Sequence, residues 1–312
     1  MGQFLFGETY WRPQLMDQVE ALMKAGKIAS KVRSEVPSIV YVGAPIVKIC
    51  DFVEGRIRKL GGAPAFPCNV DIDHVAAHYT SPEGDGSVVS DGSLVKVDIG
   101  VHVDGYIADT ATTVCLGKGL EGQVEAAEAG LDAALKAVTA GVRASTVGAV
   151  IERAIRARGF APIRNLTGHR MARYLVHAGQ SIPNVSGADS HELGVGDVYA
   201  IEPFSVPSGA TGLVTDGPPS NIYLFKKKRS LDGEVAKRML RFIQSEYRTL
   251  PFASRWVMRE FPDAGGVEAF SELIKSKCVY SYPQLVERGR SFVAQAEHTV
   301  IVEEDGCLVT TA

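Results

Sequence analysis

The sequence predicts an α+β protein with two similar halves around an antiparallel sheet and a helical insertion in the second half. Three observations predict this arrangement. A hairpin pattern covers residues 93–115, the order helix, helix, sheet occurs twice along the 312 residues, and helical patterns return between Pro207 and about Tyr282. A chain of this length can bury a large core as one domain that carries an insertion.

Two helices are expected before the hairpin. Helical periodicity runs over residues 14–36, where Pro37 stops it, and over residues 45–60, where the pair Gly61-Gly62 stops it.

The hairpin is predicted by Asp104-Gly105, because a two-residue turn of this composition supplies the positive φ angles that such loops need. A two-residue loop places Gly100 opposite Asp109. Side chains alternate across a strand, so Asp98 then shares a face with Asp109, diagonally across the ladder. Two carboxylates that converge on a half-buried face repel each other and lose hydration. The pattern predicts a positive group between them, and a metal ion is the best candidate.

The alternative is a pair of solvated aspartates on an exposed hairpin. Against it, the other face of the first strand is apolar at five successive positions, which are Val95, Val97, Ile99, Val101 and Val103. Apolar Ile107 and small Ala111 share the aspartate face. We therefore expect that face to be the wall of a cleft.

The second half repeats the first. Helices are expected at about 123–140 and 146–158, followed by strands up to Phe204. Residues 53–64 align without gaps on residues 151–162, with six of the twelve positions identical. The alternative is chance, since a helix that ends in glycine before a proline is common. A duplication would place a shared site at the seam between the halves.

An inserted helical subdomain is expected at 207–282, within a main domain of 1–206 and 283–312. Its helices are expected near 231–249, 252–260 and 267–277. The four cations of 226–229 are interpreted as a solvated loop rather than a nucleic-acid site. Strand patterns resume over 291–302, and Asp305-Gly306 is expected to turn the chain into a last strand.

The amino-acid composition limits the class of protein that this chain can belong to. A net charge of −3, 46% apolar and 22% charged residues are typical of a soluble globular protein and give no reason to expect a nucleic-acid or membrane partner. Five scattered cysteines form no C-x-x-C pair, so the sequence indicates neither a zinc knuckle nor a disulfide framework. Residues 1–13 do not resemble an export signal, and the cytoplasm is the expected location. The G-x-G-x-x-G at 117–122 follows a hairpin and lacks a later acidic residue, so we interpret it as a turn rather than a dinucleotide site.

Further candidate ligands come from three other stretches. His169 follows a glycine that allows close backbone approach. Glu202 ends an apolar strand pattern and Glu297 lies within another, and a carboxylate among apolar residues needs a partner. With Asp98 and Asp109 they form a set of four carboxylates and one imidazole. For any lone histidine, the alternative is a structural role.

This donor set carries a charge of −4, which two divalent cations would neutralise. Mixed oxygen and nitrogen ligands suit manganese, cobalt, iron or zinc, and argue against a sulfur-rich structural zinc site. Two ions about 3.5–4 Å apart can share a hydroxide nucleophile and polarise a carbonyl group. The sequence therefore predicts a hydrolase that acts on an amide or a phosphoester.

The order and context of these residues resemble the pita-bread metallopeptidases, most closely the type II methionine aminopeptidases. The similarity runs from about residue 12 to the C-terminus and rests on five motifs, 97–100, 107–111, 167–169, 201–204 and 296–299. Residues 66–67 with 76–80 resemble the family's substrate-side motif, and 175–179 its second histidine motif. The resemblance implies the α+β pita-bread fold, with the insert typical of type II, and removal of the initiator methionine from new proteins.

The resemblance also implies the role of each ligand. Asp98 would chelate one of two divalent ions, Asp109 and Glu297 would bridge both, and His169 would bind one. Glu202 would be a ligand and would also carry a proton from the bridging water to the leaving amine.

Substrate contacts are implied in the same way. His177 would stabilise the tetrahedral intermediate, and His78 would contact the substrate near the scissile amide. Phe66, Phe204 and Tyr282 would wall the methionine pocket, the alternative being ordinary core aromatics. His169 and His177 are eight residues apart, about 26 Å if extended, so the chain must bend between them to serve one site.

Two other functions stay open. The first is an X-Pro dipeptidase of the same fold, although such relatives usually carry an extra N-terminal domain and only 77 residues precede His78. The second is a non-catalytic binding protein, although all five ligands are present. The expected partners are peptides with N-terminal methionine. The first helix begins near residue 13, similar to the short archaeal members, and whether the chain docks on the ribosome stays open.

Overall fold

The computed structural model describes residues 12–187 and 191–312. The interpretation of residues 1–13 as lacking an export signal falls almost entirely outside this range. Within the described residues, no helix combines the length and apolar character that crossing a bilayer requires.

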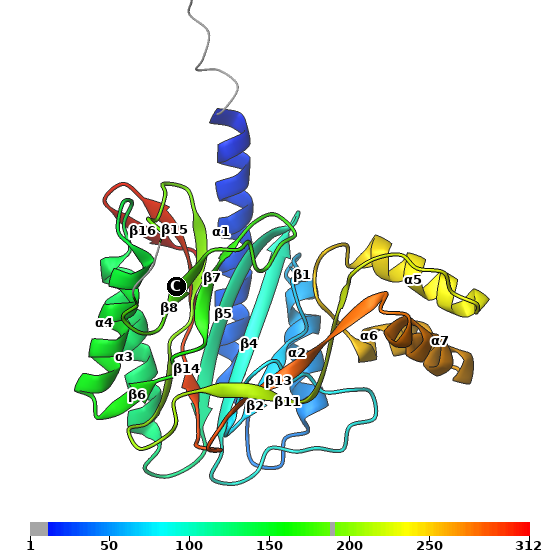
Figure 1. Cartoon of the computed structure of the whole chain (residues 1–312), viewed down its shortest axis with the longest axis horizontal. Helices are drawn as coiled ribbons and strands as arrows, with labels where there is room; N and C mark the ends of the chain where they lie inside the picture. Colours follow the sequence, from blue (N-terminus) through cyan, green and yellow to red (C-terminus); the bar gives the residue numbers. More distant parts are fainter. Residues whose placement is uncertain (1–11, 188–190) are drawn as a thin grey trace, which may run out of the picture.

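Helices α1 (Arg12–Glu35) and α2 (Ile46–Lys59) confirm the two helices expected in the first half, with a 3₁₀ turn, η1 (Val36–Ser38), where Pro37 ends the first. Both pack against the apolar face of a sheet that is ordered β1-β4-β2, with β5 paired to β4 (Figure 1). The strands of this half are β1 (Ala63–Pro64), β2 (Asn69–Ile72), β3 (Val75–Ala77), β4 (Leu94–Val103) and β5 (Tyr106–Cys115).

The β4–β5 hairpin has the predicted register. Gly100 lies opposite Asp109, and the loop consists of Asp104 (φ 52°) and Gly105 (φ 86°). The predicted alternation of side chains along β4 is also present. Val95, Val97, Ile99 and Val101 are fully buried against the helices. Asp98 is thereby directed to the opposite face, together with Asp109.

The second half begins with α3 (Glu121–Ala137) and α4 (Ala144–Ala157), followed by β6 (Phe160–Pro162). Residues 53–64 and 151–162, which align in the sequence, adopt the same conformation. Each forms the end of a helix, a glycine turn and a short strand that ends in proline. Residues 117–120 form the connection from β5, the second arm of an antiparallel hairpin, into α3. This position agrees with the interpretation of the glycine pattern as a turn.

A second sheet, ordered β16-β15-β9-β7-β8, lies beside the first and contacts it at β5 (Figure 1). Its strands are β7 (Thr167–Met171), β8 (Ser181–Pro183), β9 (Val198–Ile201), β15 (His298–Glu303) and β16 (Gly306–Val309). A third sheet joins β6, β10 (Phe204–Pro207) and β14 (Ala294–Gln295). Glu297 was expected inside a strand but lies between β14 and β15, because the chain leaves one sheet for the other at that point.

The three expected helices of the insertion are α5 (Glu234–Glu246), α6 (Ser254–Glu260) and α7 (Ala264–Lys275), which form the lobe on the right of Figure 1. They share a separate core. A long antiparallel pair that was not predicted, β11 (Val214–Phe225) and β13 (Val279–Glu287), connects this lobe to β3. The short β12 (Phe252–Ala253) extends this pair at β11. The predicted boundary at residue 282 falls inside β13, while the division into two domains remains a prediction.

Candidate metal centre

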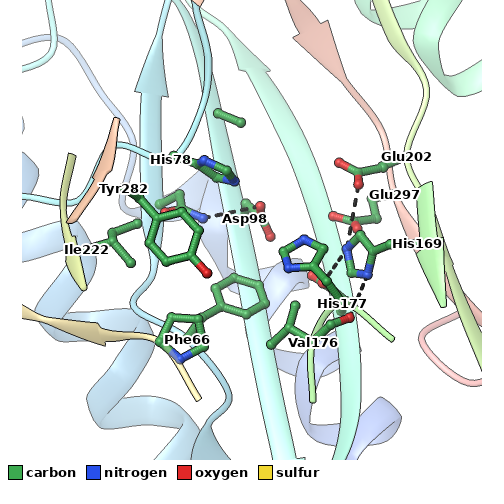
Figure 2. Close-up of a pocket in the computed structure, with 14 residues that line it drawn as sticks. Phe66, His78, Asp98, His169, Val176, His177, Glu202, Ile222, Tyr282 and Glu297 are labelled. Carbon is green, nitrogen blue, oxygen red and sulfur yellow. Dashed lines mark hydrogen bonds and ion pairs between the residues drawn. The ribbon is translucent and has the colours of Figure 1, made fainter. Parts of the chain in front are cut away.

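One pocket collects almost every residue that the sequence singled out. It lies between the two halves and the β11–β13 pair (Figure 2). Its lining includes nine of the ten predicted site residues, which are Phe66, His78, Asp98, Asp109, His169, His177, Glu202, Tyr282 and Glu297. The seam between the halves is therefore where the predicted site residues meet.

Phe204 is the exception and corrects the expectation that it walls the pocket. Its side chain is fully buried in a separate apolar cluster with Ala76, Ile163, Val206 and Val293. The reason is that the chain changes sheet after Glu202. Strand β10 begins at Phe204 and pairs with β6 and β14, so its side chain packs in the core between those strands rather than beside β9.

Two strands deliver the first carboxylates. Asp98 on β4 lies opposite Asn69 on β2, whose side-chain amide donates a hydrogen bond to Asp98 Oδ2 at 3.3 Å. Asp109 on β5 is tied to β15 through Thr299. The Asp109 amide donates to Thr299 Oγ1 at 2.7 Å, and this hydroxyl donates to the Asp109 carbonyl at 2.8 Å. The first half is thus fastened to the strand that follows Glu297.

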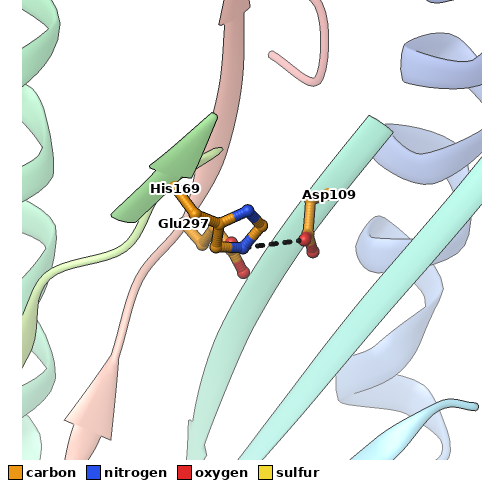
Figure 3. Close-up of side chains that lie close together, drawn as sticks. All are labelled: Asp109, His169 and Glu297. Atoms are coloured by element: carbon orange, nitrogen blue, oxygen red, sulfur yellow. Dashed lines mark ion pairs between the residues drawn. The ribbon is translucent and has the colours of Figure 1, made fainter. Parts of the chain in front are cut away.

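His169 is oriented by its backbone neighbours. Its Nδ1 donates to the Val176 carbonyl at 2.8 Å, because a carbonyl oxygen can only accept. The lone pair of Nε2 therefore points into the site, where Asp109 Oδ2 and Glu202 Oε1 each lie 3.6 Å away. Figure 3 shows His169 and Asp109 with Glu297; ligand atoms of these three residues lie within 4.8 Å of one another.

The predicted bend between the two histidines is confirmed. Ala172 and Leu175 exchange backbone hydrogen bonds of 2.9 Å, which reverses the chain after β7. The rings of His169 and His177 consequently lie 4.4 Å apart, centre to centre.

The electrostatics of the cluster are unfavourable without a cation. Burial raises the pKa of Asp98 to about 6, and burial followed by mutual repulsion raises the pKa values of Asp109, Glu202 and Glu297 well above their ordinary values. Burial also holds the pKa of His169 well below its ordinary value, so its imidazole is neutral. Its lone pair thus faces the carboxyl groups of Asp109 and Glu202.

The donors fit a divalent metal. Within the described residues, Asp98 Oδ1 and Asp109 Oδ1 are buried and have no hydrogen-bond partner. Buried polar atoms normally have partners, and an unpaired buried charge is costly. Carboxylate oxygens and a neutral imidazole nitrogen held by a second-layer hydrogen bond are the ligands that first-row divalent metals bind.

One consequence can be measured as stability. The folded-state pKa of Asp98 exceeds its unfolded value, so its contribution favours folding at low pH and is lost as pH rises through about 4 to 6. We therefore expect Asp98→Asn to raise the melting temperature of metal-free protein by about 2 °C or more at pH 7.5, and by less at pH 5. Thermal unfolding in a chelator, compared between the two proteins at each pH, measures this difference. An Asp98→Asn protein that is less stable than wild type at pH 7.5 would contradict it.

The other half of the pocket is largely apolar. Phe66 lies against Gly100, where a Cβ atom would come within 2.3 Å of the ring, so a glycine is needed at this close approach. Across from it, the rings of His78 and Tyr282 meet edge to face at 5.6 Å (Figure 2). His78 has a φ of 73°, a conformation rare outside glycine, and its buried Nδ1 has no partner among the described residues.

Five other lining residues were not predicted as site residues, which are Asn69, Ala77, Val176, Ile222 and Pro251. Ala77 and Val176 lie within the two stretches that resemble family motifs, and Asn69 is a polar residue three positions after Phe66 in an apolar stretch. Ile222 and Pro251 come from the inserted region; Ile222 lies on β11, and Pro251 directly precedes β12, which pairs with β11.

The fold and the buried donor set define a metal-dependent hydrolase. Comparison with known proteins then gives the family: residues 20–304 match the model of metallopeptidase family M24, and the chain belongs to this family. Two relatives called methionine aminopeptidase, from Methanothermobacter thermautotrophicus and Thermococcus kodakarensis, are each 48% identical over 95% of this chain and 100% of their own length.

Solved structures show the same fold at low sequence identity. A thermophilic Arx1 matches with a TM-score of 0.80 and 16% identity, over 94% of this chain and 90% of its own. The methionine aminopeptidase from Thermotoga maritima matches with a TM-score of 0.66 and 21% identity, over 95% and 96%. The predicted α+β pita-bread fold is thereby confirmed.

Proposed function

We propose that this protein removes the N-terminal methionine from peptides and nascent proteins, using two divalent metal ions. The observation that carries the proposal is the convergence of four carboxylates with a neutral, correctly oriented imidazole at one end of an apolar pocket. The names and full-length similarity of the relatives support the same activity.

The five side chains would hold the two ions together. Asp109 and Glu297 would each contact both ions, Asp98 would contact one ion, and His169 and Glu202 would contact the other. The distance of 3.6 Å between His169 Nε2 and Glu202 Oε1 supports the assignment of both residues to the same ion. Two divalent cations balance the charge of −4, and the set suits manganese, cobalt, iron or zinc.

When bound by these residues, divalent ions would supply an activated water and polarise the scissile carbonyl. The Glu202 carboxylate would accept the proton of the attacking water and donate it to the leaving amine, a role that needs one side chain able both to take up and to release a proton. His177, beside His169 at the exposed side of the pocket, donates a hydrogen bond to the oxygen that becomes negative in the tetrahedral intermediate. His78 contacts the substrate near the scissile amide.

The apolar half of the pocket receives the methionine side chain. Phe66, Ile222 and Tyr282 surround it with hydrocarbon and aromatic surface, and a thioether packs well against ring edges. A substrate with a small or charged first residue would leave this surface unfilled or bury a charge.

The inserted lobe supports assignment to the type II subgroup, with a catalytic domain of 1–206 and 283–312 and a helical subdomain of 207–282. Because nascent chains are the substrates, we place the activity in the cytoplasm. The ribosome is then the source of the substrate, and direct docking on it is a separate question.

The test compares two peptides with and without a chelator. We expect Met-Gly-Met to be cut after its first residue, Gly-Pro to be left intact, and chelator to stop the reaction until Mn²⁺ is restored. Product analysis by liquid chromatography measures each outcome. Efficient cleavage of Gly-Pro would instead support a dipeptidase, and no cleavage of either peptide by metal-loaded protein would overturn the proposal.

A further inference from the structure

Lys96 is a fully buried lysine behind the proposed metal centre. It precedes Asp98 by two residues on β4 and so shares the face that carries Asp98 and Asp109. Its Nζ donates hydrogen bonds to the backbone carbonyls of Asp73, at 3.0 Å, and Val293, at 2.9 Å. Burying an ammonium group is costly unless it is paired and hydrogen-bonded, so its presence here calls for a physical reason.

Strand β2 carries a carboxyl group, that of Asp71, which interacts electrostatically with Lys96. Asp71 lies directly opposite Lys96 in the β2–β4 register and is also fully buried. Its Oδ1 accepts the Tyr79 amide at 2.7 Å. The positive charge of Lys96 thus faces a carboxylate that belongs to the same sheet.

The two carbonyl groups belong to chain segments that reach the metal centre from different directions. Asp73 lies in the turn between β2 and β3, which connects Asn69 to His78. Val293 directly precedes β14, and its own amide donates to the same Asp73 carbonyl at 2.9 Å. Lys96 therefore joins β4, the β2–β3 turn and the segment before β14 at one point.

From that point the contacts continue to a ligand. Two residues after Val293, Gln295 exchanges hydrogen bonds with Thr113 of β5, at 2.7 and 2.9 Å. The Gln295 side-chain amide lies 3.4 Å from Glu297 Oε2 and donates toward it. The position of Glu297, which sits between two strands rather than inside one, depends on how the segment from Val293 is held.

We propose that Lys96 is a positioning residue for the metal centre: its ammonium group fixes the segment before Glu297 against the strand that carries Asp98. The proposal rests on the metal centre of the proposed function and adds a residue that touches no substrate. We expect that loss of the ammonium group weakens metal binding while the fold stays intact. Residues that orient metal ligands from behind typically affect metal affinity by about 10- to 100-fold when replaced.

The test measures metal binding directly. We expect Lys96→Met, which keeps the length of the side chain but removes its charge and donors, to bind Mn²⁺ at least about tenfold more weakly in calorimetric titration. Its far-ultraviolet circular dichroism should match wild type, and the visible absorption of its Co²⁺ form should change. Lys96→Arg, which restores a cation with several donors, should recover part of the affinity. Lys118→Met, at an exposed lysine in the turn after β5, is the matched control and should bind as wild type.

Should Lys96→Met fail to fold, Lys96→Gln, a neutral side chain that still donates, replaces it, with at least about threefold weaker Mn²⁺ binding expected. A neutral variant with wild-type Mn²⁺ affinity, stoichiometry and Co²⁺ spectrum overturns the role of Lys96 and leaves the proposed function intact. Wild-type protein that binds no Mn²⁺ would overturn the proposed function instead.

Discussion

Replacing Asp109 by asparagine is expected to lower kcat for Met-Gly-Met by about 1,000-fold or more, because the residue acts as part of a unit whose members cannot substitute for one another. Asparagine has the same shape as aspartate, but its amide has a single neutral oxygen. The Asp109 carboxylate has two charged oxygens, and each of them would contact one ion. Asp109 is 2% exposed and held at its backbone by Thr299, so no neighbouring group can move in to replace it. The variant should also bind fewer than two Mn²⁺ ions.

Steady-state kinetics with excess Mn²⁺ and a calorimetric titration measure both effects. The same hairpin provides a matched control, since Asp104 is an exposed aspartate in the turn, where asparagine also tolerates the positive φ. Asp104→Asn should therefore retain wild-type kinetics. An Asp109→Asn protein within tenfold of wild-type kcat would remove the bridging role from this residue.

Glu202→Gln is expected to have the second-largest effect. Gln can still present an oxygen toward the metal but cannot accept and return a proton, so kcat should fall by about 100- to 10,000-fold while KM changes little. Mn²⁺ stoichiometry should remain two. The acidic limb of the kcat profile against pH should also be lost, because it reports the uptake of a proton by Glu202.

A glutamate outside the pocket, Glu303 at the exposed end of β15, supplies the control: Glu303→Gln should match wild type in kcat and pH profile. Should Glu202→Gln lose a metal ion and regain wild-type kcat at high Mn²⁺, then Glu202 would be a ligand only, and the proton would have to travel through another group.

Local rules were sufficient to predict the hairpin and the shared face of Asp98 and Asp109. The Asp104-Gly105 turn sets the register, and alternation then fixes the side of each residue. Glu202 could be expected near the site because it follows directly after an apolar strand. These predictions succeeded because turn chemistry and side-chain period act over a few residues.

Contacts between distant segments could not be predicted in this way. Asn69 meets Asp98 only because β2 pairs with β4, and Lys96 becomes buried only when the segment around Val293 folds over it. The family resemblance implied that Phe204 walls the pocket, but the change of sheet after Glu202 directs its side chain into the core.

Strand β11 was missed for a different reason. Pro218 and Pro219 lie inside it, and proline cannot donate to a sheet ladder. The structure accommodates them with irregular register against β13 between Asp216 and Tyr223. The sequence of β11 was therefore interpreted as a loop that leads into helices, although the β11–β13 pair forms one side of the pocket.

The proposed function depends on two divalent ions that lie side by side, held by Asp98, Asp109, His169, Glu202 and Glu297. Anomalous diffraction from a crystal grown with Mn²⁺ tests it most directly. We expect two anomalous peaks about 3.5–4 Å apart among these five side chains, with both ions in contact with Asp109 and Glu297. Strong peaks elsewhere in the molecule, or five side chains with no ion between them at saturating Mn²⁺, would contradict it.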